Sequence, residues 1–202
     1  MFLSRLKLNP RSRQAQAELN DAYQMHRTLS KAFGDGDGEY KEARCLFRVD
    51  ESHNGDKIIL LVQSRTRPSW ESISPSDGYL MEPPMVKEFS PILRIGEVLR
   101  FRLRANPTMR HNGKRLGLYD ETAQLAWLDR KGGENGFRVL TVEANPDRHV
   151  ESRTSSGSAT FASVTFDGKL IVTDPTALTS GMESGIGSGK GFGFGLLSIA
   201  RE

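Results

Sequence analysis

Residues 98–105, VLRFRLRA, alternate apolar and basic side chains and are followed by Asn106–Pro107. This alternation predicts a half-buried β-strand, because successive side chains of a strand point to opposite faces of a sheet. A second alternating stretch, FLSRLKL at 2–8, lies near the start of the chain and is stopped by Pro10. Each of these two strands therefore opens one half of the chain.

The first half continues with helical and then extended patterns. A helical region is broken near Asn20–Asp21, and Asp21 with Gln24 three residues later resembles a capping box. A second helix is therefore expected to start at Ala22 and to end at Gly34, inside the loop GDGDGE. The stretches RCLFRVD (44–50) and KIILLVQS (57–64) are then predicted as strands.

The second half repeats this order after residues 66–95, which hold five of the nine prolines and are expected to form loops, an edge strand and a linker. Its predicted elements are a helix at 120–131, a strand at 137–144, a hairpin at 159–174 that turns at Asp167–Gly168, a short helix from Pro175 and a strand at 196–200. The pattern predicts an α+β fold of two tandem ferredoxin-like (RRM-like) β-α-β-β-α-β domains, at 1–90 and 95–202.

Composition limits the classes of partner. The 202 residues carry 28 basic and 25 acidic side chains, a net charge of +3, so a site for a polyanion must come from local clustering. Basic side chains do cluster in 1–34 and in 100–115, and the second segment contains no acidic residue. These clusters indicate a nucleic-acid partner, or else solvated surface, since alternation places Arg100, Arg102 and Arg104 together on one face.

The remaining bulk features predict a cytoplasmic protein with no membrane partner. Cys45 is the single cysteine, so it forms no intrachain disulfide and is expected to be a buried structural thiol. The start, MFLSRLKLNP, mixes charged and apolar residues and does not resemble a signal peptide. The longest apolar run, IILLV at 58–62, is far shorter than the roughly 20 residues that a membrane span needs.

The ending GIGSGKGFGFGLLSIARE (185–202) resembles two motifs and satisfies neither. A phosphate-binding loop requires Ser or Thr after Gly-Lys and a helix behind it, whereas Lys190 is followed by Gly191 and little chain remains. KGFGF at 190–194 matches the start of an aromatic RNA-binding strand, but too close to the end of the chain. We expect a flexible loop entering an edge strand, or a loop pressed against a helix or an RNA backbone, with Lys190 contributing charge.

The helix expected at 22–33 carries the chemistry. Tyr23 and His26 are three residues apart and so lie on one side of it, together with Arg27, while Ala22, Met25, Leu29 and Ala32 form its core face. No His or Cys spacing suits a metal ion. RNA supplies its own nucleophile, the 2′-hydroxyl, so its cleavage needs a base, an acid and cations but no metal. His26 suits the first two roles, and a surface Tyr–His pair without chemistry is the alternative.

Four stretches together resemble the CasE family of CRISPR precursor-RNA endoribonucleases, within the glycine-loop RAMP superfamily. They are YQMHRTLSKAF (23–33), FRLRANP (101–107) with GKR (113–115), AWL (126–128) and the glycine-rich ending GIGSGKGFGFGLLSI. The resemblance extends over the whole chain. It implies tandem ferredoxin-like domains and cleavage of a repeat stem-loop, without a metal or another cofactor, to a 5′-hydroxyl and a 2′,3′-cyclic phosphate. The product RNA would remain bound within the type I-E Cascade complex, whose other subunits are implied partners.

The resemblance also implies site residues. The family's catalytic Tyr and His correspond to Tyr23 and His26, and Lys31 takes a supporting cationic position. The family's basic hairpin corresponds to DRHVESRTSSGSATF (147–161), where Asp147 and Glu151 dilute the basic side chains. The candidate RNA-binding residues are Arg27, Arg102, Arg104, Lys114, Arg115, Arg148, Arg153, Gly187, Lys190 and Gly193. A non-catalytic RNA-binding subunit and a nucleotide-binding enzyme are the alternatives from other classes.

Overall fold

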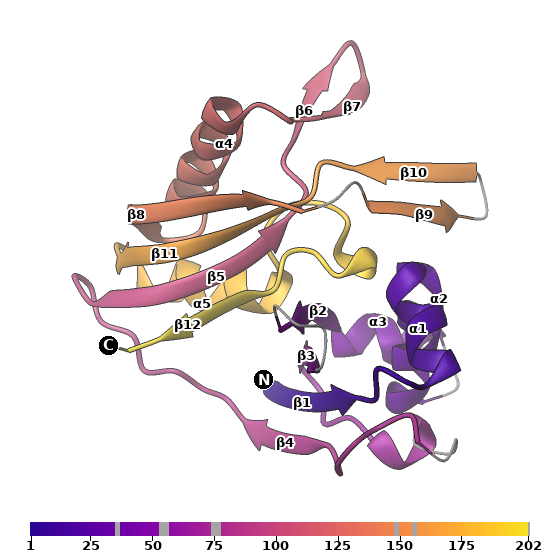
Figure 1. Ribbon diagram of the computed structural model, residues 1–202. Helices are drawn as coiled ribbons and strands as arrows, with labels where there is room; N and C mark the ends of the chain where they lie inside the picture. Colours follow the sequence, from indigo (N-terminus) through magenta and orange to yellow (C-terminus); the bar gives the residue numbers. More distant parts are fainter. Residues whose placement is uncertain (35–36, 53–56, 74–77, 148–149, 155–156, 202) are drawn as a thin grey trace. The chain divides into compact units, whose positions relative to one another are not determined.

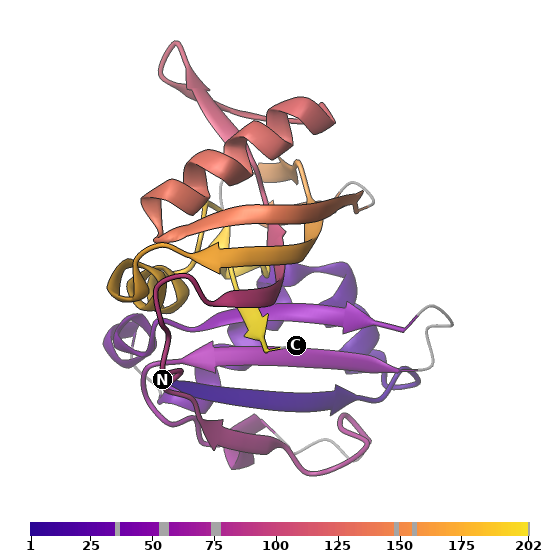
Figure 2. The ribbon, with the colours of Figure 1, turned by 90° about the vertical axis from the view of Figure 1, so that its left-hand side faces the viewer.

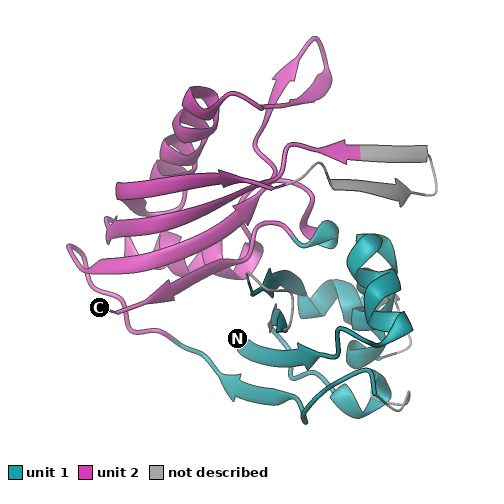
Figure 3. Cartoon of the chain, viewed as in Figure 1, with its two compact units in different colours: residues 1–90, 152–158, 191–193 teal, residues 91–151, 159–190, 194–202 magenta. Residues whose placement is uncertain are grey.

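The alternating stretches at 2–8 and 98–105 are β1 (Phe2–Leu8) and β5 (Val98–Ala105), inner strands of two different four-stranded sheets (Figure 1). The computed structural model describes residues 1–34, 37–52, 57–73, 78–147, 150–154 and 157–201, apart from the side chains at 37 and 150–159. Two units divide the chain (Figure 3): unit 1 contains 1–90, 152–158 and 191–193, and unit 2 contains 91–151, 159–190 and 194–202.

Unit 1 is an antiparallel sheet with helices that pack on its apolar face. Its strand order is β2-β3-β1-β4, and every neighbouring pair is antiparallel. The other strands are β2 (Leu46–Glu51), β3 (Ile58–Ser64) and β4 (Met85–Glu88). The helices are α1 (Arg13–Asn20), α2 (Ala22–Ser30) and α3 (Asp37–Ala43), with the short 3-10 helices η1 (Lys31–Phe33) and η2 (Trp70–Ile73).

The core of unit 1 lies between α2 and the sheet. Met25 and Leu29 are buried against Leu6, Leu8 and other strand residues. The expected core face of the helix is therefore confirmed for Met25, Leu29 and Ala32, whereas Ala22 is half-buried. The helix also begins at Ala22 as predicted, and η1 continues it to Gly34, whose φ of 103° ends the helical run.

Unit 2 repeats the architecture with one added hairpin. Its strand order is β12-β5-β11-β8, with β8 (Phe137–Pro146), β11 (Val164–Val172) and β12 (Leu197–Ala200). The helices α4 (Glu121–Glu134) and α5 (Pro175–Ser184) cover one face of this sheet (Figures 1 and 2), and η3 (Lys190–Phe192) precedes β12. This hairpin is β6 (Thr108–His111) with β7 (Lys114–Gly117). A second hairpin, β9 (Val150–Thr154) with β10 (Gly157–Phe161), has residues assigned to both units.

Both sheets have the strand order of a ferredoxin-like domain, in which the first and third strands lie at the centre. Unit 2 has both crossover helices, α4 and α5. In unit 1 the second crossover contains the short η2 among its described residues. The expected α+β fold of tandem ferredoxin-like domains is therefore confirmed.

Two local predictions were wrong. Asp167–Gly168 forms no turn but lies inside β11, where both residues pair with β5 and with β8. A Cβ on Gly168 would approach the carbonyl oxygen of Thr141 to 2.0 Å, next to a register shift at Lys169/Leu170, so the glycine serves close strand packing. The segment expected as the loop GDGDGE instead leads into α3 from Asp37.

Candidate functional site

The helix α2 is held at both ends by polar contacts within unit 1. At its start, the Asp21 side chain accepts a hydrogen bond from the Tyr23 backbone N–H at 3.0 Å, as an N-cap does. Further along, the Thr28 hydroxyl donates to Glu18 of α1 at 2.6 Å, and the buried Tyr79 hydroxyl donates to the same carboxylate. Because Glu18 is only 4% exposed, these bonds fix the rotation of α2 against α1.

The opposite side of α2 and its continuation into η1 present the predicted catalytic group. Tyr23 is 42% exposed, His26 is half-buried, and Arg27 and Lys31 are exposed. Neither cation forms an ion pair with any residue that the structure describes. A phenol, an imidazole and two available cations therefore lie on one helix edge, in the arrangement that the spacing predicts.

His26 has two neighbours that the sequence did not indicate. The Tyr40 hydroxyl of α3 lies 3.0 Å from His26 Nδ1, and the two rings meet edge to face with centroids 4.8 Å apart. Gly191 covers the same edge of the imidazole, since a Cβ on Gly191 would lie 3.4 Å from Nδ1 and 3.6 Å from Cε1. No described residue forms a hydrogen bond with Nε2.

The environment of His26 favours its neutral form. Partial burial lowers the pKa of His26 below its usual 6.5. Burial, together with the neighbouring Cys45 thiol, raises the pKa of Tyr40, so its partner at Nδ1 is an uncharged phenol. Cys45 is buried as expected, and burial raises the pKa of this thiol to about 12. At neutral pH the imidazole is therefore able to accept a proton.

The glycine-rich ending contains two Gly-x-Gly arms, 185–187 and 193–195, which are hydrogen-bonded to each other. The Ile186 N–H donates to the Gly195 carbonyl at 2.9 Å, and Ile186 and Phe194, at the centres of the arms, are buried. Gly187 and Gly193 have positive φ angles and are in close contact with aromatic rings, Gly187 with Trp127 in unit 2 and Gly193 with Phe47 in unit 1. Both glycines thus have a packing reason, whatever else they contact.

A basic groove of about 850 Å³ lies within unit 2. It is lined by the β6–β7 hairpin, by α4 and by the loop that ends at Lys190. Across the hairpin Arg110 faces Arg115 and His111 faces Lys114, all of them exposed. Because like charges directly opposite one another destabilise a strand pair, the Arg110–Arg115 pair is better suited to an anionic ligand than to stability. The structure thereby brings together the predicted residues Arg115, Gly187 and Lys190, with Lys114 on the same hairpin.

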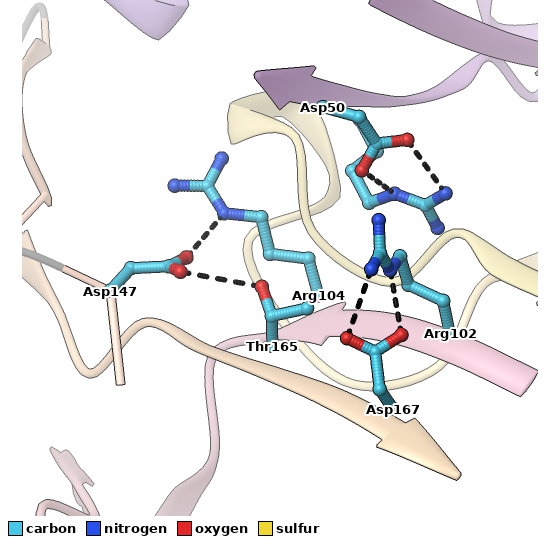
Figure 4. A network of polar contacts seen from close by, with 7 residues as sticks. Asp50, Arg102, Arg104, Asp147, Thr165 and Asp167 are labelled. Carbon is cyan, nitrogen blue, oxygen red and sulfur yellow. Dashed lines mark hydrogen bonds and ion pairs between the residues drawn. The ribbon is translucent and has the colours of Figure 1, made fainter. Parts of the chain in front are cut away.

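Arg102 and Arg104, by contrast, are already paired with carboxylates (Figure 4). Arg102 makes a two-point contact with Asp167, at 2.7 and 3.2 Å, and Arg104 Nε donates to Asp147 at 2.6 Å. The guanidinium of Arg104 also lies 5.2 Å from the centroid of the Phe194 ring, at the end of the glycine run. Arg104 therefore has a structural role in unit 2.

Two predicted RNA-binding residues cannot be placed: Arg148 and the side chain of Arg153 lie outside the described part of the chain. Among the residues that are described, no group of three or more His, Cys, Asp or Glu side chains is arranged to hold a metal ion. None of the described helices is both long and apolar enough to cross a membrane.

Comparisons with known proteins agree over the full length. A family model described as "CRISPR associated protein" matches residues 1–201. The chain is 39% identical to the CRISPR-associated endoribonuclease Cse3 of Thermus thermophilus, over 99% of this chain and 100% of that protein. It is 32% identical to the CRISPR system Cascade subunit CasE of Escherichia coli, over 99% of each.

A solved structure extends the comparison to three dimensions. Thermus thermophilus Cse3 bound to an RNA that represents a pre-cleavage complex superposes with a TM-score of 0.86. The identity is 37%, and the match covers 99% of this chain and 98% of that one. The chain thus shares both sequence and tandem-domain fold with an RNA-bound relative.

Proposed function

Because the chain belongs to the family of CRISPR-associated proteins, which it matches over residues 1–201, we propose that it is an endoribonuclease that processes CRISPR repeat RNA. The full-length identity of 39% to the endoribonuclease Cse3 supports this activity. The observation that carries the proposal is His26 itself: Nδ1 faces a neutral phenol, Nε2 has no partner among the described residues, and two available cations lie on the same helix edge.

The reaction is metal-independent cleavage of a repeat stem-loop by its own 2′-hydroxyl. The 2′-oxygen loses its proton and bonds to the adjacent phosphorus, the bond from phosphorus to the 5′-oxygen breaks, and that oxygen gains a proton. His26 is the base or the acid, and Tyr23 is its partner. Arg27 and Lys31 stabilise the charge that develops on the phosphate oxygens. The products are a 5′-hydroxyl and a 2′,3′-cyclic phosphate, and no cofactor takes part.

The RNA is held by the groove of unit 2 and by the cations of α2. Arg115 lines the groove and Lys114 lies on the same exposed strand β7, so their charges are available to phosphates, and Lys190 also lines the groove. Gly187 and Gly193 shape the loop that carries Lys190. Arg102 and Arg104 contribute less, because a carboxylate already neutralises each of them. Arg148 and Arg153 remain proposed RNA contacts, although Arg148 and the side chain of Arg153 lie outside the described part of the chain.

The processed RNA stays bound, and the protein works within a larger assembly. Its similarity to the Cascade subunit CasE supports other Cascade subunits as partners. We propose that it acts in the cytoplasm.

The decisive experiment is cleavage of the cognate repeat RNA in EDTA by the wild-type protein and by His26→Ala. Wild type is expected to leave a cyclic phosphate end, and the variant to lose about 10²- to 10⁴-fold in rate, because general acid–base catalysis contributes that much. Binding of the hairpin is expected to remain nearly intact. A repeat with a 2′-deoxy nucleotide at the cleavage site is the matched substrate control and should resist wild type.

The alternative is a non-catalytic RNA-binding subunit with the same fold. It would bind the repeat without cutting it, and His26→Ala would then change nothing. Wild-type rates in the variant, or dependence on a divalent ion, would also reject the assignment.

A further inference from the structure

The Nδ1 edge of His26 is enclosed by two segments that are far from it in sequence. The Tyr40 hydroxyl of α3 lies 3.0 Å from Nδ1. Gly191 packs against the same edge, since a Cβ at that position would lie 3.4 Å from Nδ1 and 3.6 Å from Cε1. Both segments belong to the same unit as α2. A ring held in this way can exchange a proton with a substrate only through Nε2.

The ring of Tyr40 is positioned by aromatic packing rather than by its hydroxyl. It meets Phe33 edge to face, with centroids 6.0 Å apart, and Phe33 in turn meets Trp70 at 6.3 Å. Phe33 and Trp70 are part of the buried core of unit 1, and Tyr40 packs against that core. Removal of the hydroxyl alone should therefore leave the phenyl ring, and the edge of His26 against it, in place.

The hydroxyl suits both protonation states of His26. It can accept from Nδ1–H in the imidazolium and also in the neutral tautomer that keeps its proton on Nδ1 and has lost the one on Nε2. In both states its own proton can turn toward Cys45, whose buried thiol interacts with Tyr40. Tyr40 thus keeps a hydrogen bond to Nδ1 while Nε2 gains or loses a proton.

We propose that Tyr40 is a positioning residue for His26: its hydroxyl holds Nδ1, so that Nε2 is the nitrogen that exchanges a proton with RNA. This inference rests on the proposed function for its catalytic consequence. The hydrogen bond to Nδ1 itself is a property of the free protein and can be tested without RNA. Tyr40 touches His26 rather than the substrate, and so acts through it.

The test is Tyr40→Phe in the full-length chain, read by ¹⁵N NMR of the histidine side chains. With four histidines in the chain, the His26 signals can be identified by their loss in His26→Ala. In wild type, Nδ1 and Nε2 of the neutral ring should report one dominant tautomer, held by the hydroxyl. In Tyr40→Phe both signals should move toward a mixture of tautomers. Identical signals in the two proteins would overturn the proposal.

The kinetic part uses single-turnover cleavage at saturating repeat RNA. Tyr40→Phe is expected to lose about 10- to 100-fold in rate, because a misplaced catalytic group costs that much. Its affinity for the 2′-deoxy repeat should stay within about twofold of wild type, since no RNA contact is removed. A wild-type rate would overturn the positioning role.

Tyr79→Phe is the matched control, because it removes another buried phenol hydroxyl from the same unit. Tyr79 donates to Glu18 and not to His26, so this variant should lose thermal stability but leave the His26 nitrogen signals unchanged. If Tyr79→Phe moves those signals as much as Tyr40→Phe does, the effect is structural and the proposal fails. If wild type does not cleave RNA at all, the proposed function fails, while the NMR result still decides whether Tyr40 holds Nδ1.

Discussion

Two pairs of basic side chains lie in different surroundings in this protein. On the α2 edge, Arg27 and Lys31 are exposed, and no described residue forms an ion pair with them. On β5, Arg102 and Arg104 face Asp167 and Asp147 on neighbouring segments of unit 2. The two pairs have the same charge in the sequence, but a carboxylate already neutralises each member of the second pair, which therefore has less charge to offer a phosphate. The availability of a cation depends on what lies opposite it.

The comparison is tested most strongly by removing one cation from each pair. Lys31→Gln is expected to slow repeat cleavage by about 10²-fold, because the loss of one group that stabilises transition-state charge costs that much. Arg102→Gln is expected to slow it less than about threefold, since Asp167 already neutralises that side chain. Single-turnover cleavage of the same repeat by both variants measures the difference.

Thermal unfolding of the two variants is the accompanying control. Lys31→Gln should unfold like wild type, because Lys31 has no ion-pair partner among the described residues. Equal losses of cleavage in the two variants would contradict the distinction between available and paired cations.

A smaller effect should follow from freeing an arginine on β5. Asp147 accepts from Arg104 and from the hydroxyls of Ser163 and Thr165, so Asp147→Asn leaves these donors poorly satisfied. We expect a loss of about 1–3 kcal/mol in the free energy of unfolding, measured with urea. The unpaired Arg104 should also make RNA binding more salt-dependent, and no change in either quantity would contradict the structural role of Arg104.

The smallest expected effect concerns pH and the imidazole on the α2 edge. Burial lowers the pKa of His26 in the folded protein below its unfolded value of 6.5, so the unfolded chain takes up a proton first on acidification. His26 should therefore reduce stability progressively as the pH falls below 6.5, until the folded pKa is also passed.

The measurement is the difference in melting temperature between wild type and His26→Asn at pH 7.5 and at pH 5. The variant should lose less stability on acidification than wild type does. The opposite sign would mean that His26 is stabilised as the imidazolium, contrary to its partly buried site beside an uncharged phenol.

Local sequence signals predicted most of the elements. Alternation located β1 and β5 residue by residue, and Asp21 marked the start of α2 because an N-cap acts on its own helix. The same local reasoning placed a turn at Asp167–Gly168, where the structure has a strand. Gly168 is there because the Thr141 carbonyl of β8 approaches closely, a neighbour that lies far away in the sequence.

The candidate site likewise contains residues that local spacing could predict and residues that it could not. Tyr23 and His26 could be paired from their spacing, because three residues on a helix are one turn. Tyr40 could not, since the contact of its hydroxyl with Nδ1 depends on how α3 packs against α2. The pairing of Arg104 with Asp147 could not be predicted from spacing either. It depends on β11, which pairs with β5 on one side and with β8 on the other and so brings the end of β8 close to Arg104.

The amino-acid sequence by itself located β1, β5 and α2 and the helix edge with Tyr23 and His26, because each depends on neighbours within a turn or a strand. Only the tertiary structure decided which cations are available, which nitrogen of His26 is free and why the glycines of the final loop are needed. Those properties depend on contacts between segments far apart in the chain, and the spacing of side chains along the sequence does not predict such contacts.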